Sequence, residues 1–155
     1  YLDFISDGSK RTSISRHWLY FSGGKIAERK LTEECVTWCL KKLLPRFRTI
    51  NLKVRIKEME DWGCCYKLDE KGRQFKITIK KGLSLFDLIS TICHEMVHLK
   101  QFARKELRWC NRNNNNMWKK SVHNNTPYDD QPWEKEAYRL ERRLAIEFFT
   151  STSTL

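Results

Sequence analysis

Residues 84–107 read SLFDLISTICHEMVHLKQFARKEL, and this stretch decides how the rest of the chain must fold. Ser84 followed three residues later by Asp87 is typical of a helix start. Apolar residues then recur three and four positions apart, which is the spacing of one face of an α-helix. The stretch predicts a long amphipathic helix over residues 84–107 that must bury this face against a second layer. Its apolar positions are Leu85, Leu88, Ile89, Ile92, Met96, Leu99 and Ala103.

The partner layer is predicted to be a small sheet. Residues 52–57 alternate apolar and basic side chains, which is the period of a half-buried strand. Residues 64–68 and 75–80 alternate in the same way around the turn-forming residues 69–72, as expected of an antiparallel hairpin. We therefore expect an α+β fold, zincin-like, with a small and mostly antiparallel sheet packed against the central helix.

Two more helices are predicted, over residues 32–44 and from Pro132 to about residue 149. The last of these should form the C-terminal helix that closes the site. The first 30 residues show no clear pattern. Residues 108–131 are predicted to form a long loop, and residues 151–155 a frayed tail. With 155 residues, the chain is expected to form a single domain over 1–155.

The composition points to polyanionic partners, with nucleic acid first and an anionic membrane surface second, unless the charge serves only solubility, and it contains no membrane-spanning segment. Thirty Lys and Arg against nineteen Asp and Glu give a formal net charge of +11, which favours nucleic acid. No apolar run approaches the roughly 18 residues of a transmembrane helix. The spacing of the six cysteines is not that of a disulfide framework, so buried thiols in a reducing compartment are expected. We therefore expect a cytoplasmic protein, in the host cytoplasm if it is viral, or one associated with DNA in the nucleoid.

The central helix also carries a motif with a defined chemistry. His94, Glu95 and His98 fit the pattern H-E-x-x-H. Residues four apart lie on one helix face about one turn apart, so both imidazoles can reach one zinc ion. Glu95 lies at the edge of that face, where its carboxylate can take a proton from a zinc-activated water. The motif predicts one Zn²⁺ per chain, held by His94 and His98, with Glu95 as the catalytic base.

A catalytic zinc site requires a third protein ligand. The downstream candidates are His123, Glu134, Glu136 and Glu141. On the predicted last helix, Glu134 and Glu136 flank the apolar face on opposite sides, and Glu141 is placed no worse than Glu136. Helix geometry therefore leaves the choice of the third ligand open.

A family resemblance narrows that choice. The run Thr91–His98 resembles the zinc motif of the SprT-like zincin metallopeptidases, the family of Spartan, and the run Tyr128–Tyr138 resembles a segment of phage-encoded SprT-like proteins. The resemblance covers about residues 54–141. It implies a zinc metalloendopeptidase whose third ligand is the Glu directly before an Ala, which is Glu136 here. Spartan-type members instead use a third His followed by Gly, and His123 is followed by Asn124.

Further residues are candidates for supporting roles. Tyr128, Tyr138 and His123 could donate a hydrogen bond to a developing oxyanion. The hairpin over residues 62–80 could supply an edge strand to which a protein or peptide substrate adds. Basic and aromatic residues between 99 and 121 predict a nucleic-acid surface that would bind DNA. Its basic members are Lys100, Arg104, Lys105, Arg108, Lys119 and Lys120.

Two functions from different classes follow. The first is a zinc-dependent endopeptidase that acts on protein or peptide substrates, with DNA-associated proteins as one class that the net charge and the resemblance suggest. The second is a catalytically silent, nucleic-acid-associated binding module in which the zinc site is structural. The presence of Glu95 favours the enzyme, because a structural site has no use for a base beside the metal.

Overall fold

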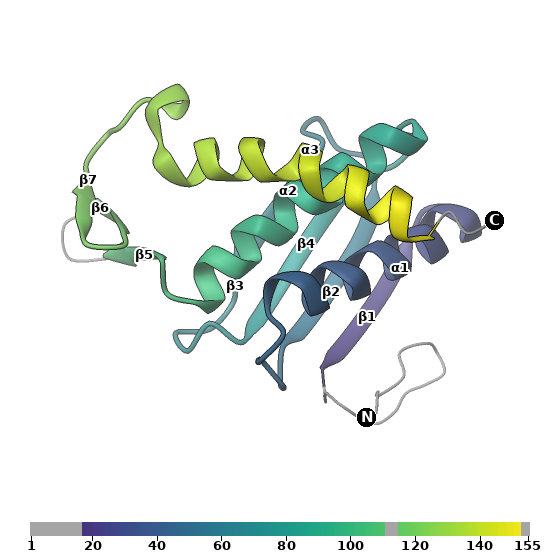
Figure 1. Ribbon diagram of the computed structural model, residues 1–155, viewed down its shortest axis with the longest axis horizontal. Helices are drawn as coiled ribbons and strands as arrows, with labels where there is room; N and C mark the ends of the chain where they lie inside the picture. The colour runs from purple at the N-terminus through teal and green to yellow at the C-terminus, as the bar shows by residue number, and fades with distance from the viewer. Residues whose placement is uncertain (1–16, 111–114, 153–155) are drawn as a thin grey trace.

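The computed structural model describes residues 17–110 and 115–152 and forms an α+β arrangement of one main sheet with helices on one of its faces (Figure 1). Three α-helices occur in the described ranges, and none of them is long and apolar enough to cross a bilayer. The helices are α1 (Ile26–Leu43), α2 (Leu85–Ala103) and α3 (Pro132–Thr152). The main sheet contains β1 (Trp18–Gly23), β2 (Asn51–Lys57), β3 (Gly63–Lys67) and β4 (Gln74–Lys80).

The order of strands in the main sheet is β1-β2-β4-β3. The expected hairpin is present, since β3 and β4 pair antiparallel. The expectation of a mostly antiparallel sheet is wrong, however, because β1 pairs parallel with β2 and β2 pairs parallel with β4. The physical reason is the crossover through α1, which returns the chain to the sheet in the direction of β1. The sheet is therefore mixed, with β3 as its single antiparallel strand and one of its edges.

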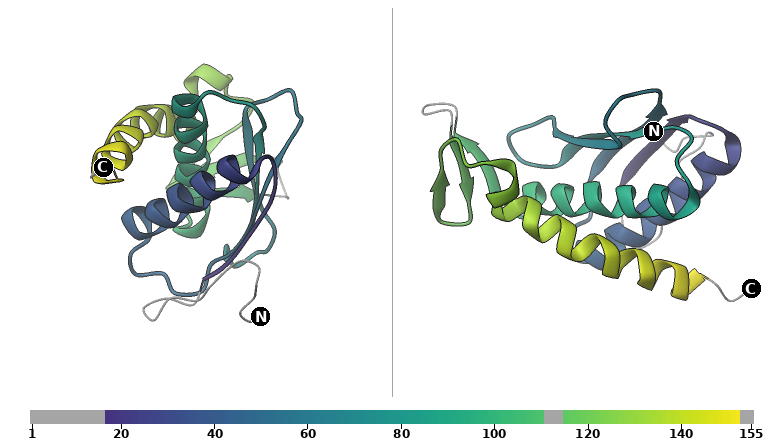
Figure 2. Two further views of the ribbon diagram at one scale, coloured as in Figure 1. Left: turned by 90° about the vertical axis from the view of Figure 1, so that its right-hand side faces the viewer. Right: turned by 90° about the horizontal axis from the view of Figure 1, so that it is seen from above.

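The core lies between the sheet and the helices. Leu52, Val54 and Ile56 of β2 are buried, whereas the alternating residues Lys53, Arg55 and Lys57 are exposed, so the predicted alternation is confirmed. Apolar side chains of β4, α1, α2 and α3 complete the same buried cluster. Figure 2 shows that the three helices gather on one side of the sheet. The opposite side of the sheet carries none of them.

The helix limits differ from the predicted ones at several ends. Helix α2 begins after Ser84, whose side chain accepts a hydrogen bond from the Asp87 amide, but it ends at Ala103 and not at Leu107. Helix α1 begins at Ile26, six residues before the predicted start. The Glu28 carboxylate accepts hydrogen bonds from the Lys25 and Gly82 amides there, which satisfies an early amide of the helix.

The segment read as a long loop contains structure of its own. A small antiparallel sheet projects beyond the end of α2, and a short 3₁₀ helix precedes α3 (Figure 1). Helix α3 begins at Pro132 as predicted and continues to Thr152, so residues 151–152 are helical and the rest of the expected frayed tail lies outside the described residues. The added elements are β5 (Leu107–Cys110), β6 (Asn115–Trp118), β7 (Ser121–His123) and η1 (Tyr128–Asp130).

Two constraints require a glycine at position 23, at the end of β1: the positive φ of its backbone and the close approach of β2. The two effects can be measured separately. The φ of Gly23 is +81°, and a Cβ built on it lies 2.0 Å from the Ile56 carbonyl oxygen. Gly82 has the same φ of +81°, but a Cβ built on it has no neighbour within 4 Å. Gly82→Ala should therefore cost only the backbone penalty of about 1–2 kcal/mol. Gly23→Ala should cost about 1–3 kcal/mol more, because β2 must shift.

Urea unfolding of both variants beside the wild type measures the difference. Equal losses of unfolding free energy in the two variants would contradict the close approach of β1 to β2 at Gly23.

Candidate metal centre

The two motif histidines and one carboxylate from another helix converge on a single point. His94 and His98 lie one turn apart on α2, and Glu134 lies in the first turn of α3. The Nε2 atoms of His94 and His98 each lie 3.2 Å from a different oxygen of the Glu134 carboxylate. The three residues thus offer three ligand atoms within 4.8 Å of one another.

The other ring nitrogen of each histidine is held by a second side chain. His94 Nδ1 lies 2.7 Å from the Glu141 carboxylate, which can only accept, so Nδ1 donates. His98 Nδ1 lies 2.9 Å from Gln101 Oε1. Gln101 Nε2 donates to the Trp133 carbonyl and to Glu136, which fixes Oε1 as the atom that faces His98. Both rings are therefore oriented with their Nε2 atoms toward Glu134.

The electrostatics of the group favour a cation at its centre. Burial lowers the pKa of His94, but hydrogen bonds to Glu134 and Glu141 outweigh burial and raise it to about 9. Burial also lowers the pKa of His98, but its hydrogen bond to Glu134 outweighs burial, so the pKa of His98 is raised. Burial would raise the pKa of Glu134, yet its hydrogen bonds to both histidines hold it well below its usual range. The site is built to surround positive charge, whether of protons or of a metal ion.

The donor set fits a zinc ion. Two imidazole nitrogens and one carboxylate are a ligand set that zinc uses in catalytic sites, with one position left open for water or substrate. Each imidazole also donates its second N–H to an oxygen, which is the usual support of a metal-bound histidine. His94, His98 and Glu134 are therefore the residues that could hold a metal, with Glu141 and Gln101 behind them.

Glu136, the residue that the resemblance implied as third ligand, is not part of this group. Its carboxylate accepts hydrogen bonds from Lys100 Nζ at 3.1 Å and Gln101 Nε2 at 2.9 Å. Residues two apart on a helix project about 200° from each other, so Glu134 and Glu136 cannot both face the histidines. The first turn of α3 presents Glu134 to them, and Glu136 instead holds Gln101 in place.

His123, the other proposed ligand, also lies outside the group. It ends β7, its Nδ1 lies 3.2 Å from Thr126 Oγ1, and its ring packs edge-on against Trp133. The proposed oxyanion donors Tyr128 and Tyr138 are nearer to the group. The Tyr128 hydroxyl donates to Glu134 at 3.1 Å and lies 2.9 Å from the Tyr138 hydroxyl, and the Tyr138 ring packs on His94.

An open pocket of about 740 Å³ adjoins the three ligand atoms. Glu95 lines this pocket, is only 6% exposed, and has its pKa raised by burial. Strand β3 forms the opposite wall, and it approaches so closely that a Cβ on Gly63 would lie 3.1 Å from Glu95 Oε2. The pocket thus brings a buried carboxylate, two tyrosine hydroxyls and a sheet edge to the candidate metal position.

Sequence reasoning missed Gln101 altogether and considered Glu141 only as a ligand. Gln101 is fully buried three residues after His98, on a helix whose other buried residues are mostly apolar. An amide at such a position requires buried partners. A polar residue about one turn beyond the second histidine of the H-E-x-x-H motif was the available signal for its supporting role.

The basic residues expected to form a nucleic-acid surface do not gather into one free patch. Lys100 is mostly buried and pairs with Glu106 and Glu136, and Arg104 also pairs with Glu106. Lys105 Nζ donates to two carbonyls of the turn between β3 and β4. Arg108, Lys119 and Lys120 are exposed, with Lys119 Nζ 5.1 Å from the Trp118 ring centroid.

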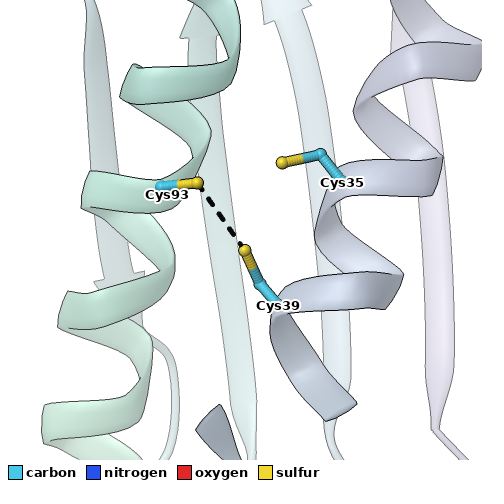
Figure 3. A group of neighbouring side chains, drawn as sticks. All are labelled: Cys35, Cys39 and Cys93. Carbon is cyan, nitrogen blue, oxygen red and sulfur yellow. Dashed lines mark hydrogen bonds between the residues drawn. The ribbon is translucent and has the colours of Figure 1, made fainter. Parts of the chain in front are cut away.

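A second group of ligand-type side chains lies between α1 and α2. Cys35 and Cys39 of α1 face Cys93 of α2, with the Cys39 and Cys93 sulfurs 3.9 Å apart (Figure 3). All three are fully buried among apolar residues. Hydrogen bonds to the neighbouring thiols, together with burial, raise the pKa of Cys39 well above its ordinary value. Hydrogen bonds to Cys35 and Cys39 instead lower the pKa of Cys93 to about 5. The three sulfur atoms lie within 4.8 Å of one another, so this group could also hold a metal ion, but none of its residues lines the pocket that Glu95 lines.

Comparisons of this chain with protein-family models, with curated proteins and with solved structures find no match. The chemistry of the site must therefore be inferred from its residues alone.

Replacing Glu134 and Glu136 separately tests which of them holds the metal. Glu134→Gln should weaken zinc binding by more than the roughly 10- to 100-fold that is typical of losing a supporting residue. Glu136→Gln should weaken it by less, because Glu136 acts only through Gln101 and His98. Competition of each variant with a chromophoric chelator measures both affinities. A larger loss in Glu136→Gln than in Glu134→Gln would restore Glu136 as the ligand.

Proposed function

We propose that the protein is a zinc-dependent endopeptidase. The observation that carries the proposal is the convergence of His94, His98 and Glu134 beside a buried Glu95 in an open pocket. A bound zinc ion would supply Lewis acidity, lowering the pKa of a coordinated water molecule and polarising the scissile carbonyl. The chain's own groups would supply the proton transfers and hold the substrate.

Glu95 is the general base of this proposal. Its carboxylate lines the pocket one residue after His94, so it lies beside the ligand atoms without being one of them. Burial raises its pKa, which strengthens the carboxylate as a proton acceptor near neutral pH. The same carboxyl group can return the proton to the leaving amine, because it lines the pocket without belonging to the three candidate ligands.

Two tyrosines and a strand edge position the substrate. The hydroxyls of Tyr128 and Tyr138 lie 2.9 Å apart at the pocket wall, so one of them can turn from its present partner to donate to a developing oxyanion. Among the strands that the structure describes, β3 pairs with β4 alone, and its residues Gly63 to Tyr66 line the pocket. An extended peptide that adds to this free edge would pass the zinc position with its backbone held by hydrogen bonds.

The resemblance to SprT-like metallopeptidases supports this reading through the H-E-x-x-H motif. The position of Glu134 departs from that resemblance, which implied Glu136. The alternative function is a binding module with a structural zinc. Such a module has no role for an open pocket or for a buried, uncoordinated carboxylate at Glu95.

Glu95→Gln separates the two functions. The amide has the same shape but cannot accept the proton, so hydrolysis of an unfolded protein substrate should fall by at least about 100-fold. Zinc content should remain at one ion per chain, since Glu95 is not a ligand in this proposal. The matched control is Glu34→Gln on the exposed side of α1, which should keep wild-type activity.

Gel-based cleavage of casein and metal analysis of the same preparations give both readouts. Wild-type chain that binds zinc but cleaves nothing would favour the structural module. Unchanged cleavage by Glu95→Gln would remove this residue from the mechanism.

A further inference from the structure

The face of the main sheet that carries no helix (Figure 2) holds five basic residues on its two central strands. The strand register places Tyr20, Lys53, Lys76 and Tyr66 side by side in one row across all four strands. Tyr20 is 56% exposed and Tyr66 is 48% exposed, so each end of the row is an accessible aromatic ring. Two exposed aromatic residues thus flank a pair of exposed lysines on this face of the sheet.

More cations follow on the same face. Its basic residues, which we call the basic sheet face, are Lys53, Arg55, Lys57, Lys76 and Lys80. Strands β1 to β4 contain no Asp or Glu. Within the described residues, none of these five cations forms an ion pair with a carboxylate, in contrast to Lys100 and Arg104. Their charges are therefore available to an external anion.

The arrangement carries an electrostatic cost in the free protein. Lys53 lies directly opposite Lys76, and Lys57 lies directly opposite Lys80, on neighbouring strands. Neighbouring strands are only about 4.8 Å apart, so like charges placed opposite each other repel. No described carboxylate pairs with these lysines to offset the repulsion. A bound polyanion would offset it.

We propose that the basic sheet face binds single-stranded nucleic acid. Basic residues two apart on a strand repeat about every 6.6–6.8 Å, which forms a track of charges for consecutive phosphates. Tyr20 and Tyr66 offer rings on which unpaired bases stack, a contact that a paired duplex cannot make. An anionic membrane fits less well, because the Leu, Val and Ile residues of these strands face the helices and leave no aliphatic group to insert.

This site is distinct from the proposed metal centre, although β3 borders both. Tyr66 belongs to the row on the basic sheet face and also lines the pocket. The binding variants are therefore chosen on β1, β2 and β4, where no residue lines the pocket. If Glu95→Gln abolishes peptidase activity but still binds nucleic acid like the wild type, the nucleic-acid site does not depend on the proposed peptidase function.

The charge test uses a triple variant and a matched control. Lys53→Gln, Arg55→Gln and Lys76→Gln together remove three cations from the basic sheet face. The control removes three exposed cations from other surfaces, as Lys30→Gln, Arg46→Gln and Arg142→Gln. Fluorescence anisotropy with a labelled 20-nucleotide oligo(dT) is measured from 50 to 200 mM NaCl. The slope of log affinity against log salt should flatten by up to about 2 in the triple variant, at about 0.7 for each phosphate contact.

The stacking test replaces Tyr20 by Ala. Binding of oligo(dT) should weaken about 5-fold or more while the salt slope stays unchanged, because a ring contact releases no counterion. Thermal melting guards against unfolding as the cause. The charge variant should melt no lower than wild type, since it removes repulsion between Lys53 and Lys76.

Three outcomes would overturn the proposal. The first is an equal loss of affinity in the control and in the triple variant. The second is tighter binding of a 20-base-pair duplex than of the single strand. The third is binding to phosphatidylserine vesicles that the triple variant abolishes, with no binding of oligo(dT).

Discussion

The contact between α2 and α3 is the constraint on which the rest of the site depends. Trp133 and Ala137 of α3 are buried, which fixes the rotation of this helix over α2 (Figure 1). That rotation directs Glu134 at His94 and His98, and it turns Glu136 toward Lys100 and Gln101. Apolar packing in the core therefore selects which carboxylate meets the histidines.

The same contact allows α2 to bury an unusual number of polar groups. His94, Glu95, His98 and Gln101 are all buried on one helix, and unpartnered polar groups there would cost about 1–3 kcal/mol each. Residues of α3 supply partners for three of them, through Glu134, Glu141 and the Trp133 carbonyl. Among the described residues of α3, none forms a hydrogen bond with Glu95, which lines the pocket instead. A carboxylate left in that position is suited to exchange protons with a bound substrate or water.

The sequence predicted those helices and strands that a short stretch of residues defines by its own spacing of apolar side chains. The helical spacing around the H-E-x-x-H motif and the alternation of β2 both appear in the structure. Strand β1 was missed because WLYFSG is partly buried on both faces and shows no alternation. Its parallel pairing with β2 depends on a crossover that no short window contains. The choice of Glu134 over Glu136 likewise depends on how two helices pack, and a resemblance confined to short motifs could not supply that.

Anomalous diffraction can locate the zinc ion that we propose to bind between α2 and α3. Crystals grown with one equivalent of zinc would be measured on both sides of the zinc absorption edge. We expect one strong anomalous peak about 2.0–2.2 Å from His94 Nε2, His98 Nε2 and a Glu134 carboxylate oxygen. A peak among Cys35, Cys39 and Cys93, a peak beside Glu136, or no peak in zinc-saturated crystals would contradict it.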